Sequence, residues 1–133
     1  MDGQGGGIGA TIIKLLRQTL GERLEILAVG ANSVATSRMM KAGANKGATG
    51  ENAVVTTSRR VDAIMGPLGI LLADAMMGEI TPRMAAAVAG SNSRKIVIPL
   101  TQEEVTIVGA SSEPLPHLVM RAIDTIREMV ENV

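Results

Sequence analysis

The stretch that decides the fold is Asp-Gly-Gln-Gly-Gly-Gly-Ile-Gly at residues 2–9, in which five of eight positions are glycine. Residues 5–10 fit the spacing G-x-G-x-x-A, and residues 3–9 fit the G-x-x-x-G-x-G spacing of short-chain dehydrogenases. Apolar residues then recur at helical spacing, at Ile12, Ile13, Leu16 and Leu20. Because glycines let a backbone approach a phosphate and a helix start offers free N–H groups, the stretch predicts a phosphate-binding turn. The alternative is a tight strand-to-helix turn with no ligand.

Two usual companions of such a dinucleotide fingerprint are missing. A β-strand should precede the glycines, but only Met1 and Asp2 do so. A carboxylate should follow the next strand and bind a ribose hydroxyl, but residues 30–33 read Gly-Ala-Asn-Ser. Asn32 and Ser33 are the polar groups left there for a sugar or a phosphate. The chain has no Tyr, so the Tyr/Lys pair of short-chain dehydrogenases is excluded.

The rest of the chain alternates short apolar runs with amphipathic segments. Strands are predicted over residues 24–29, 53–57, 61–66, 95–100 and 105–108. Helices are predicted from the glycine stretch to residue 20, from a Ser33 cap to Gly43, over 67–77, over 81–89, and from Pro116 onward, with a loop over 43–52. This order predicts one domain over residues 1–133, a three-layer α/β Rossmann-like sandwich with a mostly parallel sheet and its first strand missing from the N-terminus.

The missing strand would be central in such a sheet, with neighbours on both edges. Unpaired buried backbone groups are costly, so we expect the gap to be filled. One alternative is that the natural protein starts upstream of Met1. The others are a partner chain's strand, or closure of the strands at 61–66 and 24–29 on each other.

Composition limits the classes of function. Lys plus Arg and Asp plus Glu both number 13, so no net charge draws the chain to nucleic acid or an anionic membrane. There are no aromatic residues to stack on bases, and no Cys for thiol chemistry. Residues 1–60 carry eight basic and four acidic side chains, which suits an anionic ligand or reflects only solvated faces. No export signal or membrane span is evident, so a cytoplasmic location is expected.

Other polar residues are weaker candidates. Thr49, Glu51 and Asn52 lie in a predicted loop that would either cover a ligand or be an ordinary solvated turn. Asp74 and Glu79 are the further carboxylates considered for acid–base chemistry. His117 is the only histidine and is expected to face solvent, so no transition-metal site is predicted, whereas Mg²⁺ held through a ligand's phosphates stays open.

Six segments together resemble a family of small bacterial proteins catalogued only as a domain of unknown function. They are residues 2–9, Ala-Thr-Ser at 35–37, Lys-Ala-Gly-Ala-Asn at 41–45, Ala-Thr-Gly-Glu-Asn-Ala at 48–53, Gly-Glu-Ile-Thr-Pro at 78–82 and Ile98-Pro99. The resemblance covers nearly the whole chain. It implies a Rossmann-like fold and no defined activity.

The leading functional hypothesis is a binding protein for a phosphorylated small molecule, with a nucleotide or dinucleotide among the candidates. The residues expected to bind it are Gly3, Gln4, Gly5, Gly6, Gly7, Ile8, Gly9, Asn32, Ser33, Thr49, Glu51 and Asn52. The alternatives are an enzyme that acts on that ligand through Glu51, Glu79 or Asp74, and a structural or regulatory subunit whose glycine loop is only a turn. The apolar, alanine- and methionine-rich composition predicts a homo-oligomer.

Overall fold

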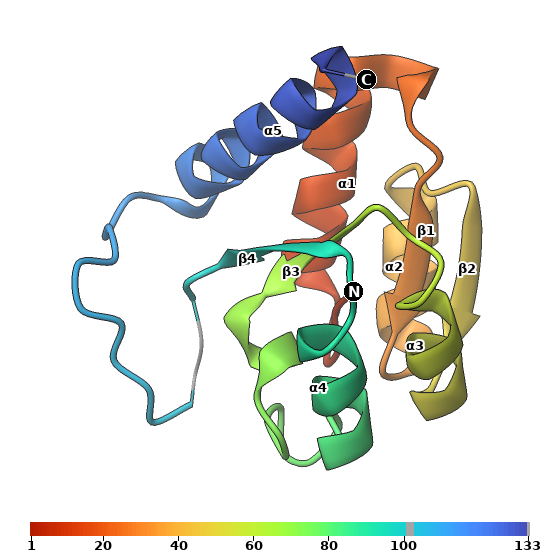
Figure 1. Ribbon diagram of the computed structural model, residues 1–133, viewed down its shortest axis with the longest axis vertical. Helices are drawn as coiled ribbons and strands as arrows, with labels where there is room; N and C mark the ends of the chain where they lie inside the picture. Colours follow the sequence, from red (N-terminus) through yellow and green to blue (C-terminus); the bar gives the residue numbers. More distant parts are fainter. Residues whose placement is uncertain (101–102, 133) are drawn as a thin grey trace.

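The computed structural model describes residues 1–100 and 103–132. Its α-helices are α1 (Gly7–Leu20), α2 (Ser33–Lys41), α3 (Glu51–Thr57), α4 (Pro82–Ala89) and α5 (Leu115–Glu131). Its strands are β1 (Leu27–Gly30), β2 (Lys46–Thr49), β3 (Ala63–Pro67) and β4 (Arg94–Ile98), and two 3₁₀ turns, η1 (Gly21–Arg23) and η2 (Leu68–Leu71), follow α1 and β3. Figure 1 shows helices on both sides of the strands, which is an α/β sandwich as predicted.

The described strands form two parallel pairs rather than one sheet. β1 pairs with β2 in the register Leu27↔Lys46 to Gly30↔Thr49, and β3 pairs with β4 from Ala63↔Arg94 to Pro67↔Ile98. A single parallel bridge joins Asp2 to Gly30. One of the three alternatives for filling the gap, closure of the strands at 24–29 and 61–66 on each other, is therefore wrong, because β1 and β3 belong to separate sheets.

Two apolar cores lie on opposite faces of the strands. One lies under α1, α2 and α5, and its buried side chains include Ile12, Leu16, Met39, Val119 and Ile123. The other lies under α3 and α4 and includes Val54, Ile70, Ile80, Met84 and Val88. Neighbouring strand residues alternate between the two cores, as Ala28 and Val29 do, because successive side chains of a strand point to opposite faces.

Several sequence predictions are confirmed. The α1 helix ends before Gly21, and Thr81 caps α4 with Pro82 at the first helical position. α5 includes Pro116 in its first turn and buries the stripe of Leu118, Ala122 and Ile126. His117 is exposed.

Other segments differ from prediction. Residues 53–57 are helical, since a short apolar run does not distinguish a strand from a helix and packing against α4 decides. The predicted loop at 43–52 holds β2, whose exposed residues form no apolar run that would predict a strand. The predicted helix at 67–77 is only the η2 turn followed by tight turns, and its apolar residues reflect burial rather than helical periodicity. Residues 105–108 form no strand.

Arg17 anchors the C-terminal half of α1. Its Nε donates to the carbonyl of Gly43 at 2.8 Å, and its Nη1 donates to the carbonyls of Gly21 and Leu24, each at 2.9 Å. Its Nη2 donates to Oδ1 of Asn45, and that same oxygen accepts the Ile26 N–H at 2.7 Å. One guanidinium thereby joins α1 to the turn after it and to the segment that leads into β2.

Candidate functional site

The glycine loop at residues 3–9 forms a tight turn that opens α1. The Gly6 N–H donates to the Gly3 carbonyl at 2.9 Å, and Gly6 is the N-cap of α1 in the left-handed conformation, with φ 72°. A Cβ at Gly6 would lie 2.8 Å from Cα of Ala35 in α2, so glycine is required there both by conformation and by space. Among the described residues no side chain caps this helix end.

The Asp2 side chain binds both ends of the glycine loop through hydrogen bonds, a role that the sequence did not predict. Its side chain is buried, at 4% exposure, and its two oxygens accept N–H groups from opposite ends of the loop. Oδ1 accepts the Gly3 N–H and Oδ2 accepts the Gly9 N–H, both at 2.8 Å. The position directly before the glycines was the available signal, since Asp side chains commonly bind backbone N–H groups one or more residues on.

Arg38 brings a positive charge to the loop, and it too was missed. From α2 its Nη1 reaches the Gly5 carbonyl at 3.4 Å. A Cβ placed at Gly7 would lie 3.4 Å from the same nitrogen, which puts the guanidinium directly beside the start of α1. The excess of basic residues in the first 60 positions was the only sequence signal for it.

Glu79 and Asn32 bind the other side of the loop. Oε1 of Glu79 accepts the Gln4 N–H at 2.7 Å, and both its carboxylate oxygens accept from Nδ2 of Asn32, at 3.0 and 3.2 Å. Asn32 also donates to the Gln4 carbonyl, and its Oδ1 caps α2 by accepting the Ala35 N–H. The cap of α2 is thus Asn32, and not Ser33, which is the exposed first residue of that helix.

The three candidates around residue 50 lie on the neighbouring elements. The Thr49 hydroxyl lies 2.7 Å from that of Thr36 in α2. Glu51 turns toward α4, where it accepts the Thr81 hydroxyl at 2.6 Å and lies 3.7 Å from Arg83. Asn52 is exposed. No hydrogen bond found within the described part of the chain joins these three residues to the glycine loop.

The segment that carries Glu79 has a strained backbone. Asp74, Met76 and Met77 all have left-handed φ values, of 66°, 58° and 57°, and Gln4 in the facing loop has φ 48°. A Cβ at Gly3 would lie 2.7 Å from both Oε1 of Glu79 and Sδ of Met76, so the two segments are in close contact. Asp74 is exposed and Ala75 is buried. Non-glycine residues in this region persist where surrounding structure fixes them, commonly at functional sites.

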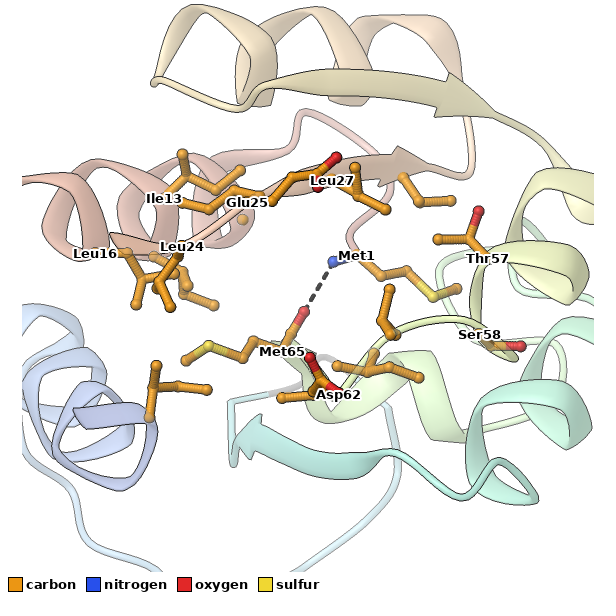
Figure 2. A pocket seen from close by; sticks show the side chains of 18 of the residues that line it. Met1, Ile13, Leu16, Leu24, Glu25, Leu27, Thr57, Ser58, Asp62 and Met65 are labelled. Carbon is orange, nitrogen blue, oxygen red and sulfur yellow. Dashed lines mark hydrogen bonds between the residues drawn. The ribbon is translucent and has the colours of Figure 1, made fainter. Parts of the chain in front are cut away.

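A cavity lies between β1 and β3 and reaches Gly9 at the end of the glycine loop. It has a volume of about 670 Å³ and a mainly apolar lining with three charged side chains, Glu25, Arg60 and Asp62. The Met1 amino group is buried in it and donates to the Met65 carbonyl at 2.8 Å (Figure 2). Burial lowers the pKa of this amino group, against a smaller opposing effect of the Asp2 charge.

Residues 1–100 and 103–132 contain neither a membrane-spanning helix nor a metal-binding cluster. Within these ranges no helix has the length and apolar character needed to cross a membrane. Nor do three or more His, Cys, Asp or Glu side chains there come together in a way that would hold a metal ion.

Comparison with known proteins gives a family but no activity. No curated protein and no solved structure matches this chain. One family model does match, over residues 1–131. With this match over nearly its whole length, the chain belongs to the family described as Domain of unknown function (DUF3842).

Proposed function

We propose that this protein binds a phosphorylated small molecule at the glycine loop, with the anion over Gly5–Gly7. The observation that carries the proposal is the Arg38 guanidinium beside the N-terminus of α1. A helix N-terminus and a guanidinium both favour an anion, and both lie on the Gly5–Gly7 side of the loop. The bare glycine backbone there leaves room for phosphate oxygens to approach.

The two sides of the loop differ in charge, which orients the ligand. Glu79 occupies the side of Gly3 and Gln4, where its carboxylate accepts hydrogen bonds from the Gln4 N–H and from Nδ2 of Asn32. The phosphate therefore lies toward Arg38, and the remainder of the ligand extends toward Asn32, Ser33 and Thr49 at the ends of β1 and β2. A nucleotide or dinucleotide has the polar groups to use these positions.

Thermal shift and isothermal titration calorimetry with inorganic phosphate, ATP, NAD and NADP test the proposal. A ligand that binds the native state raises the melting temperature with its concentration. Arg38→Gln removes a charge-assisted contact of about 1.5–3 kcal/mol, so affinity should fall roughly 10- to 100-fold. Arg59→Gln, which changes an exposed arginine far along the chain, serves as the control and should leave affinity unchanged.

Gly7→Val tests the approach of the ligand to the backbone. Gly7 does not have a positive φ, so the fold should tolerate valine, while the branched side chain meets Arg38 and covers the start of α1. Binding should be lost with the fold retained. Unchanged affinity for the best-stabilising ligand would remove the binding hypothesis, and a cooperative loss of folding would favour the turn-only alternative.

A second candidate is an enzyme that uses Glu79 as its acid or base. Of the three carboxylates considered, Glu79 contacts the glycine loop, whereas Glu51 is bound by Thr81 and Arg83 and Asp74 is exposed. Glu79→Gln should abolish turnover of the bound ligand with little change in affinity. Turnover that persists in this variant would exclude Glu79 from the chemistry.

A further inference from the structure

The Glu79 carboxylate meets the glycine loop through neutral donors alone. Its Oε1 accepts the Gln4 N–H at 2.7 Å and Nδ2 of Asn32 at 3.0 Å, and its Oε2 accepts the same Nδ2 at 3.2 Å. Among the described residues, no lysine, arginine or histidine forms an ion pair with Glu79. The loop therefore has a guanidinium at Gly5 and a carboxylate without a cation at Gln4.

Oε2 of Glu79 has room for a further hydrogen-bond donor. An ionised carboxylate has about four acceptor sites. One hydrogen of the Asn32 amide is shared between the two Glu79 oxygens, because the other donates to the Gln4 carbonyl at 2.9 Å. Asn32 has no hydrogen left to give, and Glu79 is partly exposed. The next donor to Oε2 is consequently water or a ligand.

The segments around Glu79 hold the carboxylate in this place. Gly3 is buried, and a Cβ there would lie 2.7 Å from Oε1 of Glu79, so a side chain at Gly3 would displace the carboxylate. The turn before Glu79 is closed by the Ile80 N–H, which donates to the Ala75 carbonyl at 3.1 Å. The Met76 N–H in the same turn donates to Oε1 of Glu103 at 2.8 Å. The carboxylate is therefore fixed beside the loop before any ligand arrives.

One small ligand can reach both Glu79 and the anion position. Glu79 binds the N–H of Gln4, and the anion position proposed above begins at the next residue, Gly5. A residue spans at most about 3.6 Å, and the loop is folded more tightly still, because the Gly6 N–H donates to the Gly3 carbonyl. The atoms that follow the phosphate group of a bound ligand therefore lie within reach of Glu79.

A sugar hydroxyl is the donor that suits this place. A second acidic group would be repelled by Glu79, and an alkyl group would displace water from Oε2 without replacing its hydrogen bond. A hydroxyl donates to a carboxylate without adding a charge. The side chains beyond Asn32 are themselves neutral hydroxyls, those of Ser33, Thr36 and Thr49, and Thr36 donates to the Asn32 carbonyl at 3.2 Å. These groups can exchange hydrogen bonds with a sugar, whereas the chain has no aromatic side chain on which a base could stack.

We propose that Glu79 is the specificity-determining residue of this site and that its Oε2 accepts a sugar hydroxyl. The ligand is then the phosphate ester of a sugar with free hydroxyls, a chemistry that ribonucleotides and free sugar phosphates share. This inference rests on the proposed anion site at Gly5–Gly7. It assigns Glu79 to binding, so that replacing Glu79 changes affinity, whereas an acid–base role changes turnover.

Isothermal titration calorimetry with AMP, 2′,3′-dideoxy-AMP, ribose 5-phosphate and inorganic phosphate tests the inference. AMP should bind at least about tenfold more tightly than its dideoxy form, which lacks both sugar hydroxyls. Glu79→Gln should reduce this ratio to nearly one and should not weaken binding of inorganic phosphate. Glu113→Gln is the matched control, because it makes the same change in a carboxylate that pairs with Arg121, and it should keep the ratio. Ribose 5-phosphate that binds as tightly as AMP would identify a sugar phosphate as the source of the hydroxyl, and weaker binding would identify a nucleotide.

The ratio between AMP and its dideoxy form is measured on the unchanged chain, so it tests the inference even if Glu79→Gln does not fold. Equal affinity for these two compounds would overturn the inference and leave the proposed anion site standing. A ratio that persists in Glu79→Gln would assign the hydroxyl to another residue, and tighter binding of phosphoethanolamine than of ribose 5-phosphate would assign Glu79 to an ammonium group. If no probe binds, inorganic phosphate included, the proposed function is wrong and this inference with it.

Discussion

Replacing Asp2 by alanine should destabilise the protein strongly. The substitution removes a buried carboxylate that accepts two backbone N–H groups at 2.8 Å, those of Gly3 and Gly9. Each bond to a charged acceptor contributes about 1.5–3 kcal/mol, and each buried N–H left unpaired costs a comparable amount. We expect a loss of about 3–4 kcal/mol after partial access of water to the loop. For a chain of this size that is roughly 10–15 °C in melting temperature.

Urea unfolding and thermal melts monitored by circular dichroism measure this loss. Asp2→Asn keeps one acceptor oxygen and should lose about 2 kcal/mol. Asp124→Ala is the matched control, since Asp124 forms an exposed pair with Arg127, and it should change stability by less than about 0.5 kcal/mol. A melting temperature for Asp2→Ala within about 2 °C of the parent would refute the reasoning, because the carboxylate would then not organise the loop.

Three further predictions follow from the same structure. Gly6→Ala should lower the free energy of unfolding in urea by about 2–3 kcal/mol, because Gly6 has a left-handed φ and a Cβ there would meet Ala35. Gly21→Ala is the control and should cost only about 1 kcal/mol, because Gly21 has φ 59° but lies in open space. Equal losses in the two variants would show that the contact with Ala35 is unimportant. Burial lowers the pKa of the Met1 amino group below its ordinary 8.0, and the charged groups near it are Asp2, Glu25, Arg60 and Asp62. Between the two pKa values the unfolded chain binds a proton that the folded chain has released, so the free energy of unfolding should rise with pH up to about pH 8. Urea midpoints that do not change with pH would contradict this. The alanine- and methionine-rich composition predicts a homo-oligomer, and a monomeric mass by light scattering at tens of micromolar would count against it.

The sequence predicts the fold well where periodicity is long or a cap is explicit. The stripe of α5 spans four turns, and Thr81-Pro82 begins a helix whatever lies around it. It predicts less where one short apolar run carries the information. Val54 and Val55 are buried residues of α3, but adjacent valines are also typical of a strand. Residues 67–77 are apolar because Ile70 and Ala75 pack into the core, so composition reports burial and not conformation.

For the site, the sequence predicts the loop but not the side chains that meet it. The glycines predict a turn before a helix, and the structure has that turn before α1. Arg38 and Glu79 lie 33 and 75 positions from the loop residues to which they are hydrogen-bonded, and only the packing of α2 and the strained segment brings them there. Local spacing holds no information on such contacts.

The hydrogen bonds of Arg17 have a consequence for the anion binding proposed at the opposite end of α1. Its guanidinium donates to three carbonyls and to Asn45, so α1 cannot slide along its axis or rotate about it without losing several hydrogen bonds together. The position of Gly7 at the start of α1 is consequently constrained by the hydrogen bonds that Arg17 makes near the other end of the helix. If an anion binds at that end as proposed, the helix loses little further conformational entropy on binding, because these hydrogen bonds already hold it in place.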